Sequence, residues 1–143
     1  LKTFGSTDGG PYRGWSEKLL SAIGQVRSGM EQSMVWFQKE AMQKNWVTKE
    51  DFDEKKGEIL IQDPGDKETI GDREMTKEAW SKLNWEDLNR DLWAVMLDKT
   101  EGEAEAKVME EQMGEGIRAY QRVHYWFQKT SGKALGERIG ISR

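Results

Sequence analysis

The residues best suited to chemistry in this chain are a single histidine and several groups of carboxylates. His124 lies in a stretch with helical spacing, beside Tyr125 and Phe127. One histidine in a chain without cysteine cannot complete a usual zinc site, and it would be the only base for any serine nucleophile. The sequence contains no Gly-x-Ser-x-Gly turn, phosphate-binding loop or dinucleotide fingerprint. We therefore interpret His124 as a packed or exposed helix residue.

Acidic residues are concentrated in two parts of the chain, at positions 50–54 and 101–111. Carboxylates at this density could hold a hard cation, but their spacing lacks the central glycine and terminal glutamate of a calcium-binding loop. Lysines are interspersed among them, which is typical of a solvated helix face. We predict no catalytic residue, no metal site and no cofactor, and we interpret the protein as a non-enzyme.

The composition indicates a cytoplasmic protein that does not enter a membrane. The 143 residues include 22 Lys and Arg against 26 Asp and Glu, which gives a net charge of -4. An acidic balance excludes a uniformly basic clamp for nucleic acid, because such clamps neutralise phosphates over their whole surface. Mean hydropathy is -0.87, and no apolar run approaches the roughly 20 residues that span a bilayer.

Apolar residues recur at helical spacing through most of the chain, which predicts an all-α fold. The expected helices cover residues 12–27, 30–44, 48–62, a stretch from 76, 85–99, 103–112 and 117–129, with a further short helix over 133–142. Ser131-Gly132 is expected to end the 117–129 helix. Residues 1–11 carry three glycines and Pro11, so they should be extended. Residues 63–74 are rich in turn formers and charge, and we predict a loop there.

We expect residues 1–143 to form a single helical domain, although the 63–74 loop could also join two small lobes. Helical spacing selects the residues that should form the core, namely Trp15, Leu19, Ile23, Phe37, Leu88, Leu92, Tyr120, Val123 and Phe127. The seven tryptophans exceed what a small core requires, and several fall at the edges of their helical faces. Of these we predict that Trp36, Trp46 and Trp126 contact other chains.

Three stretches, taken in order, resemble the Gag capsid domain of copia-type long-terminal-repeat retrotransposons. Phe4-Gly5 followed by residues 12–15 (YRGW) is similar to the way that family leads into its first helix. Residues 92–97 (LWAVML), followed by residues 102–104 (GEA), resemble a second family pattern. Residues 116–123 (GIRAYQRV), with Trp126-Phe127, resemble a third. A host gene derived from such an element would have the same patterns.

The resemblance implies a compact retroviral-capsid-like helical fold that self-assembles into a shell around the element's RNA, without catalysis. It also implies that Trp15, Leu92, Tyr120 and Phe127 form the core. In this family the RNA-binding region usually follows the capsid domain, so we expect any RNA contact through regions outside these residues and a homo-oligomer as the main partner. The residues alone leave open a second function, a monomeric adaptor that holds a partner helix in a groove lined by Met and Trp.

Overall fold

The computed structural model describes residues 3–5, 12–27, 29–61, 68–70, 73–75 and 77–141, with the backbone alone described at 68–70, 73–75 and 130–141. Within these residues the protein is all-α, with one small hairpin. The helices are α1 (Tyr12–Val26), α2 (Met30–Met42), α3 (Lys49–Leu60), α4 (Lys77–Ser81), α5 (Trp85–Lys99), α6 (Gly102–Met109) and α7 (Gly116–Ile141). Strand β1 (Glu68–Ile70) pairs antiparallel with β2 (Arg73–Met75).

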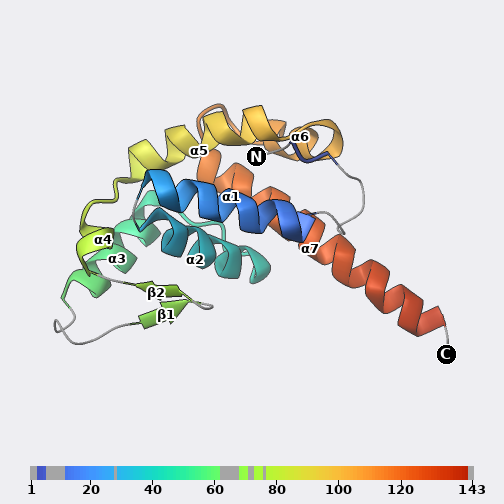
Figure 1. Ribbon diagram of the computed structural model, residues 1–143, viewed down its shortest axis with the longest axis horizontal. Helices are drawn as coiled ribbons and strands as arrows, with labels where there is room; N and C mark the ends of the chain where they lie inside the picture. Colours follow the sequence, from blue (N-terminus) through green and yellow to red (C-terminus); the bar gives the residue numbers. More distant parts are fainter. Residues whose placement is uncertain are drawn as a thin grey trace.

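Helix α7 is the element around which the others are arranged. It packs against α5, α2 and α6, while α1 packs against α2. Figure 1 shows α5 and α6 along one side of the molecule, α1 and α2 across its middle, and α3, α4 and the hairpin at the end remote from α6. The C-terminal part of α7 extends away from the other helices (Figure 1). The N-terminal part of α7 contributes Ile117, Ala119, Tyr120, Val123 and Phe127 to the core.

A single hydrophobic core joins residues from both sides of the 63–74 segment. The buried side chains include every residue that we expected in the core, namely Trp15, Leu19, Ile23, Phe37, Leu88, Leu92, Tyr120, Val123 and Phe127. Large aromatic rings fill much of this volume, and Trp80 is fully buried among them. Such rings let a small helical domain bury a large area per residue.

The N-terminal segment closes over the core as a short extended piece. Phe4 forms a parallel bridge with Thr100, and its backbone N–H and C=O bond the residues on either side of Thr100 at 2.8 and 2.9 Å. The Phe4 ring is 3% exposed and packs on Trp15 and Phe127, with centroids 5.3 and 4.7 Å away. The extended conformation expected for residues 1–11 is thus seen at Phe4, while residues 1–2 and 6–11 lie outside the described residues.

Helix α3 begins at a capping box. The Thr48 hydroxyl accepts a hydrogen bond from the Asp51 N–H, and the Asp51 carboxylate accepts one from the Thr48 N–H, both at 3.1 Å. An aspartate therefore completes a capping box in which glutamate or glutamine is usual. Helix α5 also starts with a side-chain cap, because the Asn84 side chain accepts a hydrogen bond from the Asp87 N–H.

Two segments differ from the prediction. Residues 68–70 and 73–75 pair as strands, although the segment 63–74 was predicted to be a loop; three-residue strands are too short to show an alternating pattern. The other residues of that segment lie outside the described ones. Ser131-Gly132 does not end a helix, because α7 continues to Ile141 and includes the separate helix predicted over 133–142. A helical glycine costs only about 1 kcal/mol, and no proline removes a backbone bond there.

Helix α7 starts where it crosses α5 at very close range. A Cβ on Gly116 would lie 2.1 Å from the backbone N of Trp93 and 2.3 Å from the backbone O of Asn89. The Asn89 side chain also accepts a hydrogen bond of 2.9 Å from the backbone N–H of Ile117. Only a residue without a side chain fits at this crossing, and α5 satisfies one of the free amides at the start of α7.

One buried amide holds the turn between α2 and α3 against α7. Gln121 is 0% exposed, and its Oε1 accepts from the Val47 N–H at 3.0 Å. Its Nε2 donates to the carbonyl oxygens of Phe37 and Asn45 at 3.0 and 3.1 Å. This side chain therefore ties α2 and the turn after it to α7, and it supplies the hydrogen-bond partner of the buried Val47 N–H.

Candidate interaction surfaces

The histidine lies in a buried polar network that ties α1, α2 and α7 together. His124 is 5% exposed, and its Nδ1 is 2.7 Å from the Tyr12 hydroxyl. Beside this pair, the Gln38 amide donates to both Ser16 Oγ and the Tyr120 hydroxyl. Among the described residues, no group of three His, Cys, Asp or Glu side chains is placed to hold a metal ion. These hydrogen bonds fix the positions of α1, α2 and α7 relative to one another.

We expect the stability of the protein to fall as pH drops from 6.5 towards 4, because burial lowers the pKa of His124 from 6.5 to about 4. Above pH 6.5 the ring is neutral in both states; between the two values the unfolded chain binds a proton that the folded one excludes. The loss amounts to about 3 kcal/mol at pH 4. Urea unfolding of the wild type and His124→Gln from pH 7.5 to 4 measures it. If the free energy of unfolding changed with pH equally in the two proteins, His124 would not be the group that causes the loss of stability.

Trp36, one of the three predicted contact tryptophans, lies largely inside the domain. It is 9% exposed, and its ring packs edge-on against Trp80 with a centroid separation of 6.2 Å. Its indole N–H donates to the Glu40 carboxylate. Helical spacing within α2 alone placed Trp36 at the edge of a face, but α4 covers that edge. Little of Trp36 is left to contact a second chain.

Trp46 and Trp126 are half-buried, and each ring lies against a different cation. Trp46, in the turn after α2, packs edge-on against Tyr125 with centroids 5.9 Å apart, and the Arg122 guanidinium lies 4.8 Å from its ring centre. The Trp126 ring lies beneath the Lys107 ammonium of α6, at 4.0 Å. Both rings are therefore paired with cations that remain partly accessible to solvent. The structure does not bring the three predicted contact tryptophans into one surface.

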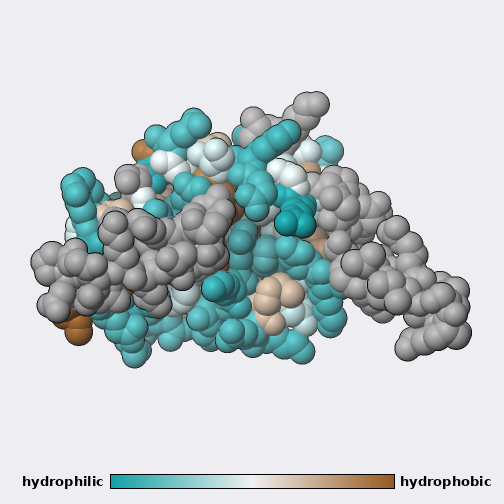
Figure 2. All heavy atoms as spheres, turned by 60° about the horizontal axis from the view of Figure 1, so that its bottom comes forward, coloured by the Kyte–Doolittle hydropathy of each residue, from teal (hydrophilic) through white to brown (hydrophobic). Residues whose placement is uncertain are grey.

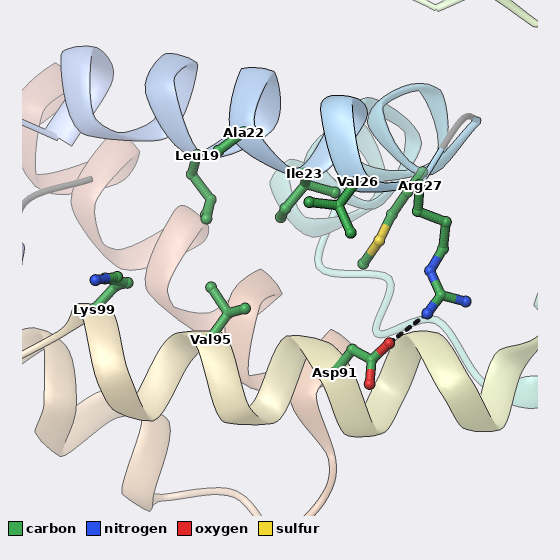
Figure 3. A pocket seen from close by; sticks show the side chains of 9 residues that line it. Leu19, Ala22, Ile23, Val26, Arg27, Asp91, Val95 and Lys99 are labelled. Carbon is green, nitrogen blue, oxygen red and sulfur yellow. Dashed lines mark hydrogen bonds and ion pairs between the residues drawn. The ribbon is translucent and has the colours of Figure 1, made fainter.

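An apolar groove of about 340 Å³ runs between α1 and α5 (Figure 3). Its floor and walls are aliphatic, formed by Leu19, Ala22, Ile23, Val26, Met30 and Val95. An ion pair of 2.5 Å between Arg27 and Asp91 closes one end, and Lys99 stands at the other (Figure 3). The groove contains one methionine and no tryptophan, so it differs from the Met- and Trp-lined groove that an adaptor was expected to have.

Large exposed hydrophobic side chains are few and scattered. The most exposed are Val26, Ile61, Met109 and Met113, the last at 89%. Figure 2 shows a face that is mainly hydrophilic, with hydrophobic residues only in small separate areas. Met109 ends α6 and Met113 follows in the turn towards α7, so both belong to the region of the chain that contains Lys107. Two of the exposed methionines thus lie at the end of α6 and in the turn that follows it.

Comparison with known proteins returns no match. The chain matches no protein-family model, no curated protein and no solved structure. Among the described residues, no helix is long and apolar enough to cross a bilayer. The function is therefore inferred from the residues of this chain and their contacts.

Proposed function

We propose that the chain is a structural, capsid-type protein of the Gag class, from a copia-type retrotransposon or a host gene derived from one. It self-associates in the cytoplasm into a shell that packages the element's RNA. It works by binding other chains and carries no catalytic site.

The observation that carries this proposal is the convergence of the three stretches that resemble the family. Phe4 and Trp15, from the first stretch, stack with centroids 5.3 Å apart. Phe127, from the third, packs edge-on against Phe4 at 4.7 Å. Thr100, which lies between the two parts of the second stretch, is paired with Phe4 in a bridge whose hydrogen bonds come from Lys99 and Glu101. The three stretches thus meet in one packed core, as the resemblance implies.

The end of α6 supplies the best candidate for the contact between subunits. Met109 and Met113 are 61% and 89% exposed, and methionine suits adaptable interfaces. Trp126, one of the predicted contact residues, lies beneath Lys107 in the same region. Methionine and aromatic residues are enriched in surfaces that bind other proteins.

We expect Met109→Gln/Met113→Gln and Trp126→Ala each to weaken self-association of the protein by about tenfold, since each removes apolar area from the contact. The measurement is mass by light scattering after size exclusion, over a range of protein and salt concentrations. Trp36→Ala serves as a contrast, because losing a buried tryptophan should lower stability by about 3 kcal/mol instead.

A matched control is Trp93→Ala, which removes a half-buried tryptophan that was not assigned to the contact. If the wild type forms assemblies and only the α6 and Trp126 variants lose them, imaging with RNA is the next step. Assemblies unchanged in both variants would rule out the α6 contact. A wild type that stays at the mass of one chain at every concentration would count against self-association.

The groove between α1 and α5 favours the second candidate function, a monomeric helical adaptor. Its aliphatic lining and charged ends would suit one apolar face of a partner helix, with the Arg27–Asp91 pair and Lys99 setting the helix's direction. This function predicts a single-chain mass at all concentrations. It also predicts that Val95→Asp abolishes partner binding without changing that mass, because the aspartate would place a charge in the groove.

A further inference from the structure

Helix α7 is basic within an acidic protein. Its 26 residues include five Lys and Arg and one Glu, so the remainder of the chain is more acidic than its net charge of -4 indicates. No acidic residue lies in the part of α7 between Gly116 and Lys129 that packs on the core. Cations gathered along one helix are the usual electrostatic mark of a surface that meets phosphate.

The corner where the α2–α3 turn meets α7 combines this charge with aromatic rings. We call the group Lys44, Trp46, Arg122, Tyr125 and Lys129 the α2–α7 corner. Trp46 and Tyr125 are half-buried and lie nearly perpendicular, at 86°. Arg122 covers the Trp46 ring at 4.8 Å, and the Lys129 ammonium is 5.3 Å from the centre of the Tyr125 ring.

The lysines of this corner are available to a ligand. Arg122 already bonds the Glu111 carboxylate at 2.5 Å, whereas neither Lys44 nor Lys129 pairs with a carboxylate among the described residues. Hydrogen bonding to the Lys129 ammonium, with the charges of Lys129 and Lys44, lowers the pKa of Tyr125. Two ammonium groups therefore lie close to one aromatic hydroxyl, and both are exposed to solvent.

The fold holds this corner in place before any ligand arrives. Lys44 has a left-handed backbone conformation, with φ of 59°, and its N–H bonds the Ala41 carbonyl at 2.9 Å. Gln121 of α7 bonds the backbone of Asn45 and Val47 on either side of Trp46. The turn cannot move away from α7 without breaking those buried bonds, so binding would cost little ordering of the chain.

We propose that the α2–α7 corner binds single-stranded nucleic acid, with Lys44 and Lys129 contacting phosphates and bases stacking on Tyr125 and on the Arg122 guanidinium that covers Trp46. Stacking and phosphate contact are tolerant of sequence, so the site should bind without strong base preference. This extends the proposed packaging function, because it places an RNA contact on the helical domain itself. An acidic peptide would also meet the lysines, but it would leave the two aromatic rings without a partner.

The test is the anisotropy of a fluorescein-labelled 15-nucleotide oligouridine titrated with the full chain, at protein concentrations where scattering gives the mass of one chain. Lys44→Gln/Lys129→Gln should weaken binding about tenfold and reduce the slope of log affinity against log salt by about 1.4, since two phosphate contacts are lost. Tyr125→Ala, which leaves the lysines intact, should weaken binding about tenfold by removing a stacking surface. Lys18→Gln/Lys82→Gln is the matched control, with two exposed lysines on α1 and next to α4.

Binding that is unchanged in the Lys44/Lys129 variant, or equally reduced in the control variant, would overturn the site. Absence of wild-type binding at 50 mM salt would do the same. The site would also be overturned if the Lys44/Lys129 variant lost self-association but kept oligouridine binding, because the corner would then be a contact between protein chains. Self-association is measured separately by scattering, so a protein that assembles without binding oligouridine would refute this site and leave the proposed assembly standing.

Discussion

Gly116→Ala is expected to destabilise the protein by about 3 kcal/mol or more, through overpacking at the crossing of α5 and α7. The new Cβ would lie 2.1 Å from the Trp93 backbone N, 2.3 Å from the Asn89 backbone O and 2.7 Å from the Leu92 backbone C. All three are backbone atoms, so no side-chain rotation can relieve the overlap. The start of α7 would have to move off α5, and the bond from Ile117 to Asn89 would be lost. Urea unfolding at pH 7.5 measures the change.

The same substitution at two other helical glycines gives a matched control with the opposite sign. A Cβ at Gly14 or Gly57 would meet nothing within 4 Å. Gly14→Ala and Gly57→Ala should therefore raise stability by about 0.5–1 kcal/mol, because alanine loses less backbone entropy in a helix. A Gly116→Ala protein as stable as the wild type would show that the two helices are further apart than described.

Gln121→Leu is expected to cost about 3 kcal/mol, because it removes the three hydrogen bonds of a buried amide and leaves the buried Val47 N–H without a partner. Leucine has nearly the size of glutamine but cannot accept from Val47 or donate to Phe37 and Asn45. The turn after α2 should loosen, so amide hydrogen exchange at Val47 should speed up more than exchange within α5. Denaturant unfolding combined with site-resolved exchange gives both quantities.

Gln25→Leu is the control, since Gln25 is exposed on α1. An exposed change of this kind usually lies within about 0.5 kcal/mol of zero. If Gln121→Leu changed the free energy of unfolding as little as Gln25→Leu, water would have to replace the side chain as the partner of the Val47, Phe37 and Asn45 backbone groups.

The helices and much of the core could be predicted from the sequence because both depend on local spacing. The apolar residues of α5 repeat along one face, and its predicted range 85–99 agrees with the observed helix. The helix predicted from residue 48 starts at Thr48, whose capping box with Asp51 spans only three residues along the chain. Core residues such as Leu92 and Phe127 followed from the same periodicity, since a residue on the apolar face of a helix is buried by whichever element covers it.

Contacts between distant parts of the chain could not be predicted in this way. Trp36 lies at the edge of its own helical face, and only the position of Trp80 on α4 shows that it is buried. Nothing near Gln121 in sequence indicates that its partners lie more than 70 residues away. The α2–α7 corner likewise joins Trp46 to Tyr125, and the excess of basic residues in α7 was the one sequence signal that pointed towards it.

The central position of α7 also bears on how the chain folds as it is synthesised. Tyr12 meets His124 across 112 residues, and Gln38 meets Tyr120 across 82. At about 5–20 residues per second, the first helix would wait on the order of ten seconds for the last one to leave the ribosome. During that interval the aromatic faces of α1 and α2 lack the helix that covers them and are open to aggregation. The yield of native protein should therefore depend on translation speed and temperature as well as on final stability.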